Sequence, residues 1–159
     1  MKKVDALLGD YASHHRAHGN LVCHSIGIPL IVFGILAFLR SVPLPGLPSG
    51  WTAAEALIGA AFLFYAALDL PLALAMLLPM ALLDLGAKAA GSWQAGLAAF
   101  VAGWIFQGIG HARYEKNRPA FFRNLLHLLI GPLFLVNELA RLRPVVALPS
   151  GSAEKPSLR

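Results

Sequence analysis

Histidine is the residue type in this chain best suited to chemistry, and its spacing is uneven. Four of the six histidines fall between residues 14 and 24, directly before a long apolar run. A fifth ends a later apolar run, and the sixth lies inside the last one. These residues are His14, His15, His18, His24, His111 and His127. Neutral imidazole is the commonest protein ligand for iron, zinc and copper, so the pattern predicts a metal site if the fold joins the clusters.

Two further polar residues accompany the histidines at helical spacing. Asn20 lies four residues before His24, and Glu115 lies four residues after His111, so each pair shares a helix face. We expect Glu115 to accept a hydrogen bond from His111 and to orient its ring. Gly108 and Gly110 are expected to allow a close approach beside that histidine.

The adjacent histidines admit more than one interpretation. His14 and His15 point in different directions on a helix, so only one of them is expected to reach a given metal. The His14-x3-His18 pair is weak evidence, because surface helices produce it by chance. Histidines that only face lipid headgroups are the competing interpretation. The clustering of most of them at one end of the predicted fold favours a metal.

The composition places the chain in a membrane. Hydrophobic residues make up 57% of the 159 residues and charged residues only 13%, against roughly 45–50% and about 25% in soluble proteins. So short a soluble chain would have too much surface for so few charges. The net charge of +5 suits an anionic membrane surface, and no nucleic-acid motif is present. The lone Cys23 excludes an internal disulfide.

The hydropathy pattern predicts an all-α integral membrane bundle with about four transmembrane helices. The expected spans are residues 21–39, 51–68, 72–83 and 93–110, and the turns between them are residues 41–50, 69–71 and 86–92. An interfacial helix is expected over residues 4–19, with a break at Gly19–Asn20. Residues 124–140 are expected to lie in the interface or to re-enter the membrane. Residues 1–143 then form one domain, and residues 144–159 a disordered tail.

Small residues and basic residues add two expectations. The fourth span contains several small residues, Gly96 and Gly103 among them, which predicts close helix packing. Basic residues gather before the first span and after the fourth, which places both segments, and five histidines, in the cytoplasm. These basic residues are Lys2, Lys3, Arg16, Arg113, Lys116, Arg118 and Arg123. The expected location is a bacterial inner membrane, or the endoplasmic reticulum in a eukaryote.

Two motifs resemble those of a known family. The first is Tyr11-x3-His15-x4-Asn20-x3-His24, and the second is Gln107-x2-Gly110-His111-x3-Glu115-x3-Pro119. Together with Asn124 and Gly131-Pro132 they resemble the 2-hydroxy fatty acid dioxygenase family over roughly residues 7–140. The resemblance implies a small multi-span membrane protein that uses Fe(II) and O2 to shorten a 2-hydroxy fatty acid by one carbon.

The resemblance also implies site residues. The candidate catalytic residues are His15, His24, His111, Asn20 and Glu115, and the candidate iron ligands are His15, His24, His111 and His127. His14 and His18 have no firm counterpart in the family. A 2-hydroxy acid can chelate iron through its carboxylate and hydroxyl, and such a ligand set leaves positions for it. The implied partners are this substrate, O2 and membrane lipids, while the oligomeric state is not implied.

Two other functions are compatible with the residues. One is a di-iron membrane desaturase or hydroxylase, although such enzymes usually carry more than the six histidines found here. The other is a non-enzymatic membrane protein that binds lipid or metal. Hydrolases with a Ser–His–Asp set and nucleotide-dependent enzymes are disfavoured, because their motifs are missing.

Overall fold

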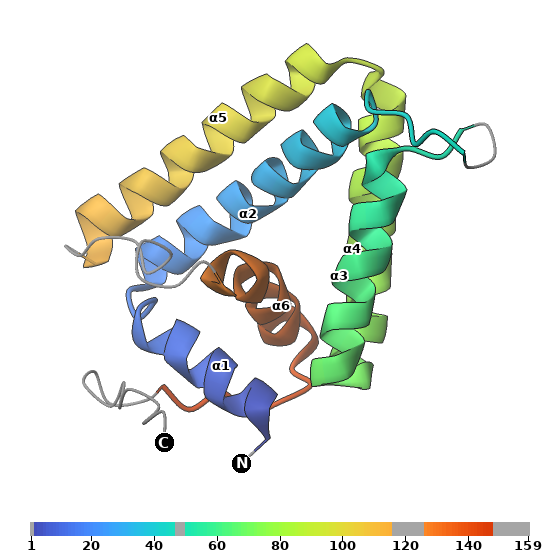
Figure 1. Ribbon diagram of the computed structural model, residues 1–159. Coiled ribbons are helices and arrows are strands. Elements are labelled where there is room, and N and C mark those ends of the chain that lie inside the picture. Colours follow the sequence, from blue (N-terminus) through green and yellow to red (C-terminus); the bar gives the residue numbers. More distant parts are fainter. Residues whose placement is uncertain (1, 47–49, 116–125, 148–159) are drawn as a thin grey trace, which may run out of the picture.

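The structure is a computed structural model that describes residues 2–46, 50–115 and 126–147, and these residues form helices and connecting loops (Figure 1). The predicted all-α fold is confirmed. The elements are α1 (Lys3–Ser13), α2 (His18–Leu39), α3 (Ala53–Leu68), α4 (Leu70–Ala90), α5 (Trp93–Ile109), the π-helix η1 (Gly110–Glu115) and α6 (Leu126–Ala140). Residues 148–159 of the expected tail lie outside the described residues, as do Lys116, Arg118, Pro119, Arg123 and Asn124.

Helices α2 and α5 lie antiparallel and side by side, with glycines at their contact (Figure 1). A Cβ atom on Gly27 would lie 2.8 Å from the carbonyl oxygen of Gly103, and one on Gly103 would lie 2.7 Å from that of Gly27. One helical heptad away, a Cβ on Gly34 would lie 2.6 Å from the carbonyl oxygen of Gly96. The two backbones therefore touch, as the small residues predict.

Side-chain caps set the ends of the second antiparallel pair, α3 and α4. Thr52 Oγ1 accepts from the Ala54 N–H at 3.3 Å and Glu55 accepts from the Thr52 N–H at 2.9 Å, which forms a capping box. Asp69, at the expected turn, begins α4 by accepting from the Leu72 N–H at 3.2 Å. Gly91 ends α4 with a left-handed φ of 56°.

Two expected boundaries are wrong. Gly19 and Asn20 lie inside the first turn of α2, which begins at His18, because the distant Glu115 binds the N–H of Ala17 at 2.8 Å. The turn expected over residues 86–92 is also shorter than predicted. Helix α4 continues to Ala90 and leaves only residues 91 and 92 between the helices.

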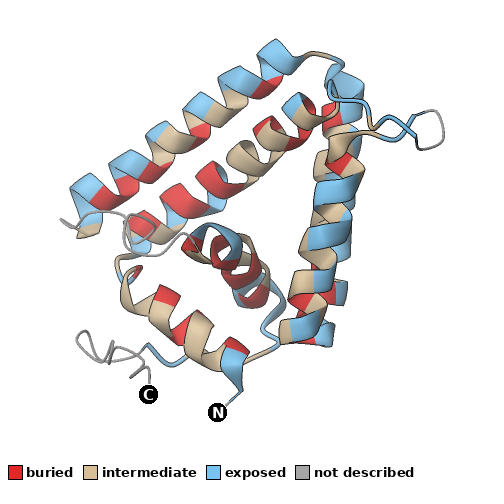
Figure 2. Ribbon diagram, viewed as in Figure 1, coloured by how far each residue is buried: buried red, intermediate tan, exposed pale blue. Residues whose placement is uncertain are grey.

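Three helical segments of the described chain are long and apolar enough to cross a membrane. They are α2, α4 and the continuous segment Trp93–Glu115, with 22, 21 and 23 residues. Helices α3 and α6 are shorter, with 16 and 15 residues. Figure 2 shows exposed outer faces along α4 and α5, where large apolar side chains such as Leu78 and Ile105 lie. The molecule is thus a membrane helical bundle.

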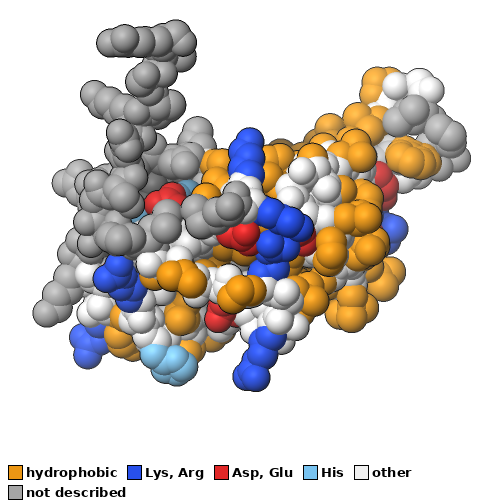
Figure 3. Space-filling view, turned by 90° about the horizontal axis from the view of Figure 1, so that it is seen from below, with side chains coloured by type: hydrophobic (Ala, Val, Ile, Leu, Met, Phe, Trp, Pro, Cys, Tyr) orange, Lys and Arg blue, Asp and Glu red, His pale blue; other side chains and the backbone are white. Residues whose placement is uncertain are grey.

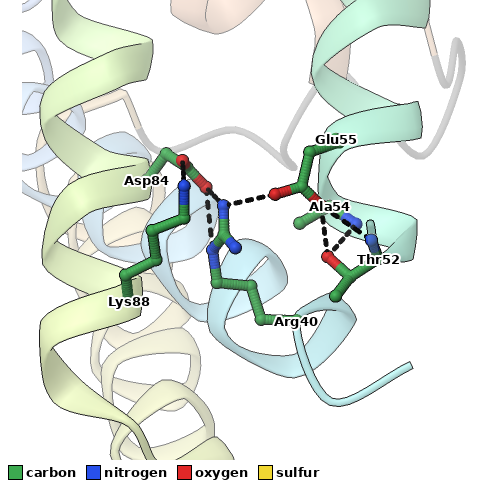
Figure 4. Close-up of polar contacts among 6 residues, drawn as sticks. All are labelled: Arg40, Thr52, Ala54, Glu55, Asp84 and Lys88. Atoms are coloured by element: carbon green, nitrogen blue, oxygen red, sulfur yellow. Dashed lines mark hydrogen bonds and ion pairs between the residues drawn. The ribbon is translucent and has the colours of Figure 1, made fainter. Parts of the chain in front are cut away.

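Charged clusters hold the helices together at both ends. At one end Arg40 donates to Glu55 at 2.9 Å and forms an ion pair with Asp84, which also contacts Lys88 at 3.4 Å (Figure 4). The opposite face gathers basic and acidic side chains among apolar ones (Figure 3). There Arg143, beyond α6, contacts Asp5 at 2.8 Å and Asp69 at 2.7 Å.

Candidate metal centre

Three histidines from distant parts of the chain converge at one point. His15 lies in the connection between α1 and α2, His24 in the second turn of α2, and His111 in η1. Each offers one ligand atom, and these atoms lie within 4.8 Å of one another. All three side chains are buried. The packing of α2 against α5 and η1 brings His24 to His111, the connection before α2 adds His15, and the three could hold a metal ion.

Hydrogen bonds fix the ring nitrogen that carries the proton in two of these histidines. The Nδ1–H of His15 donates to the carbonyl oxygen of Tyr11 at 2.7 Å, and the Nδ1–H of His24 donates to that of Asn20 at 2.9 Å. A carbonyl oxygen only accepts, so each neutral ring keeps a lone pair on Nε2. Burial, and secondarily the neighbouring His24, lowers the pKa of His15 to about 3, which keeps that ring neutral.

The two Nε2 atoms of His15 and His24 face each other at 3.1 Å. Two lone pairs at this distance repel unless a cation lies between or beside them. Neutral imidazoles with converging lone pairs and buried surroundings are the donor set that a divalent transition metal requires. The residues present therefore fit a metal ion.

Tyr11 and Asn20 position His15 and His24, respectively, through contacts on the side away from the facing Nε2 atoms. The ring of Tyr11 stacks on that of His15, with centroids 3.9 Å apart and planes 10° apart. Asn20 is completely buried and donates through Nδ2 to Glu115 at 3.2 Å. Asn20 thus links α2, which carries His24, to η1, which carries His111.

Glu115 does not orient His111 as expected. Its carboxylate accepts from the N–H of Ala17 and from Asn20, while Nδ1 of His111 has no hydrogen-bond partner among the described residues. The physical reason is that the N-terminus of α2 presents free N–H groups and partial positive charge, which attract a carboxylate. The expected close approach holds at Gly110, where a Cβ atom would overlap the side chain of Asn20, but Gly108 faces open space.

His127 lies near the three histidines but outside their group. It donates through Nε2 to Asp10 at 2.8 Å, and its ring centroid lies 5.7 Å from that of Tyr11. Its Nδ1 is buried and has no hydrogen-bond partner among the described residues. Its role as a ligand stays a prediction.

The other two histidines are outside the group. His14 donates through Nδ1 to the carbonyl of Asp10 at 2.9 Å, and of the adjacent pair only His15 belongs to the group of three. His18 is exposed at the start of α2.

A cavity of about 270 Å³ begins at the three histidines. Its wall along α2 runs from His24 to Ile35, and the apolar part from Ile28 to Ile35 is about 10 Å long at 1.5 Å per residue. The remaining lining comes from α1, the α1–α2 connection, α5, η1 and α6. The lining residues are Tyr11, His15, His24, Ile28, Ile31, Val32, Ile35, Phe100, Trp104, Gln107, His111, His127, Leu128, Gly131 and Pro132. The shape suits a molecule with a polar head and an apolar tail.

Three residues at this site are absent from the sequence-based set of catalytic and metal residues. Tyr11 suits a lipid-interface position equally well, although its spacing of four from His15 indicates a shared helix face. Asp10 gives no signal, because its partner His127 lies 117 residues away. Gln107 gives a weak one, since it lies one turn before His111 within an otherwise apolar helix.

Comparisons with known proteins find a family model and a relative that match the chain. The family model described as "2-hydroxy-palmitic acid dioxygenase Mpo1-like" matches residues 1–142. The chain is 34% identical over 137 residues to 2-hydroxy-palmitic acid dioxygenase MPO1 of Saccharomyces cerevisiae, which covers 82% of this chain and 76% of that protein. No solved structure matches.

Proposed function

The chain belongs to the Mpo1-like 2-hydroxy-palmitic acid dioxygenase family, and on this premise we propose that it is an Fe(II)-dependent dioxygenase of 2-hydroxy fatty acids. The observation that carries the proposal is the convergence of three buried imidazoles at the head of an apolar cavity. The product is a fatty acid one carbon shorter. O2 is the only oxidant needed, since RCH(OH)COOH + O2 → RCOOH + CO2 + H2O balances.

His15, His24 and His111 would hold the iron through neutral imidazole nitrogens. Bound iron would supply the redox chemistry toward O2 and coordination positions for the carboxylate and hydroxyl of the substrate. The chain itself supplies orientation. The carbonyls of Tyr11 and Asn20 fix two rings, and stacking by Tyr11 restrains the first of them.

The acyl tail of the substrate would lie in the apolar part of the cavity. Its walls on α2, α5 and α6 bring side chains such as Ile31, Phe100 and Pro132 to the cavity, which suits an alkyl chain and excludes water. A long-chain 2-hydroxy acid thus matches the site at both ends.

The site would face the cytoplasm, at a bacterial inner membrane. Supporting this orientation, the start of α2 and the end of η1 carry the histidines at the same end as Lys2 and Arg113. Single cysteines at Lys2→Cys and Ser41→Cys, in a Cys23→Ser background, provide the test. An impermeant maleimide added to intact cells should label the second and spare the first, and the reverse pattern would overturn the orientation.

The proposed activity is tested by oxygen uptake. Anaerobically purified protein loaded with Fe(II) should consume O2 when 2-hydroxypalmitate is added. The activity of His111→Ala should fall by more than roughly 10–100-fold, which is the usual loss when only a residue that hydrogen-bonds to a metal ligand is removed. The exposed His18→Ala is the matched control and should keep full activity. Absence of uptake by well-folded, iron-loaded protein would overturn the proposal for this substrate.

The metal content of the same sample distinguishes this enzyme from a two-metal oxidase. The described residues gather a single group of three histidines, so we expect one iron per chain. A ratio of two would favour the desaturase-like alternative, and iron binding without uptake of any 2-hydroxy acid would favour a non-enzymatic role.

A further inference from the structure

Gln107 is a buried amide that faces the cavity. It lies on α5, four residues before His111, and the residue is only 7% exposed. It lines the cavity, yet its amide forms no hydrogen bond with any residue that the structure describes. Buried polar groups are nearly always paired, so an amide left open toward a cavity indicates a bound partner.

The position of Gln107 is where the polar and apolar parts of the cavity meet. It lies in the last turn of α5, one helical turn before His111. Its Nε2 lies 3.3 Å from the place where a Cβ atom on Gly27 would be. Gly27 is between His24, which belongs to the metal centre, and Ile28, the first apolar lining residue on α2.

We propose that Gln107 recognises the 2-hydroxyl group of the substrate, an inference that rests on the proposed function. When the carboxylate lies at the histidines and the tail lies along α2, the second carbon passes the level of Gln107. The amide oxygen Oε1 accepts the hydroxyl proton. Gln107 then selects a 2-hydroxy acid over an unsubstituted fatty acid. Binding of the unsubstituted acid would leave the amide of Gln107 without a hydrogen-bond partner.

A second neutral polar group, the Tyr11 hydroxyl, does not duplicate this role. Tyr11 comes from α1 and stacks on His15, and its hydroxyl lies 3.1 Å from where a Cβ on Gly131 of α6 would be. It therefore faces the α6 wall, whereas Gln107 faces α2 from α5. Its hydroxyl is a hydrogen-bond donor and suits a carboxylate oxygen.

Binding under anaerobic conditions tests the proposal without turnover. Fe(II)-loaded protein is titrated with 2-hydroxypalmitate and with palmitate. Wild type should prefer the hydroxy acid, and Gln107→Met, similar in length but unable to pair, should lower that preference about tenfold. Affinity for palmitate should be unchanged or higher. Gln94→Met, on the exposed first turn of the same helix, is the matched control and should keep the wild-type preference.

Thermal unfolding of the metal-free, ligand-free protein separates recognition from a structural role. If Gln107 has no protein partner, Gln107→Met should melt at or above the wild-type temperature, whereas a structural amide would make it melt lower. A variant that melts lower, or one that keeps the full preference for 2-hydroxypalmitate, overturns the assignment to Gln107 alone. Wild type that binds neither acid overturns the proposed function as well, so the two failures are distinguishable.

Discussion

At the scale of single residues, the same local hydrogen bond orients two of the histidines. His15 and His24 each donate from Nδ1 to the carbonyl four residues earlier, at 2.7 and 2.9 Å. Local backbone thus sets both tautomers, and both Nε2 lone pairs turn inward without any carboxylate partner. His127 differs, because a carboxylate, Asp10, receives its Nε2–H. In both histidines a local backbone carbonyl leaves the Nε2 lone pair available for a metal.

Glu115 is expected to support the metal centre from a distance. Its carboxylate joins the N–H of Ala17 to Asn20, whose carbonyl holds His24. Glu115→Ala should therefore weaken metal affinity by roughly 10–100-fold, the usual effect of losing a partner behind a ligand. Glu115→Gln keeps an acceptor oxygen and should lose much less. Competition with a chelator measures both, and equal losses would contradict this role.

The sequence predicted the convergence of histidines better than it predicted their hydrogen-bond partners. The family resemblance implies His15, His24 and His111 as ligands, and these are the three histidines whose ring nitrogens the structure brings together. The expected Glu115–His111 bond was wrong because helical spacing shows only which residues share a face. It does not show that the start of another helix competes for the carboxylate.

At the scale of the elements, the contact between α2 and α5 positions the metal centre. Glycines at matching heptad positions bring the backbones together, so His24 and His111 lie close without large intervening side chains. Overpacking this contact should therefore separate the two ligands.

Gly103→Ala and Gly108→Ala make a matched pair on α5. The first places a Cβ atom 2.7 Å from the carbonyl oxygen of Gly27, whereas the second meets nothing within 4 Å. We expect Gly103→Ala to destabilise the fold by about 1–3 kcal/mol. Gly108→Ala should be neutral or stabilise it by up to about 1 kcal/mol. Unfolding in detergent measures the difference, and equal melting temperatures would argue against the glycine contact.

The apolar wall on α2 should limit the length of the acyl chain. Ile35 is the last residue of α2 along this wall, so Ile35→Trp should fill the far end of the cavity. The preference of this variant for long over shorter 2-hydroxy acids should fall by about tenfold or more. Ile26→Trp, on the exposed side of the same helix, is the control and should leave chain-length preference unchanged. Competition between acids of two lengths gives the ratio directly.

The order and type of the elements followed from hydropathy, but two boundaries did not. The start of α2 depends on Glu115, which comes from a segment 98 residues away. The end of α4 depends on the left-handed Gly91, while Gly86 stays helical and lies against Phe33. Two glycines in one short segment look alike in a sequence, and tertiary packing decides which of them ends the helix.

At the scale of the whole molecule, two charged clusters join helices that are distant in sequence. One joins the end of α2 to α3 and α4 through Arg40 (Figure 4). The other joins α1, the α3–α4 turn and the segment after α6 through Arg143, whose backbone also binds Asn137. These pairs act between helices, and removal of one partner would leave a partly buried charge unpaired.

The Arg143 cluster predicts a pH dependence of stability. The hydrogen bond from Arg143 holds the pKa of Asp5 below its usual range. A lowered carboxyl pKa contributes stability above the unfolded value, near pH 4, and loses it as the pH falls through the folded value. Wild type should therefore lose more stability than Asp5→Asn on acidification from about pH 5 to 2.

The exposed Glu138→Gln is the control for this experiment and should follow the wild-type curve. Melting temperatures across that range test the prediction. Parallel curves for wild type and Asp5→Asn would contradict it.

The pairing of α2 with α5 also has a consequence for biogenesis. The helix that carries Asn20 and His24 is synthesised before its partner, which follows only after α3 and α4. At roughly 5–20 residues per second, several seconds separate their emergence from the ribosome. During that interval the first helix waits in the bilayer with its polar side chains unpaired. Membrane insertion of this protein should therefore depend on a factor that shields the polar side chains of α2 until α5 has been translated.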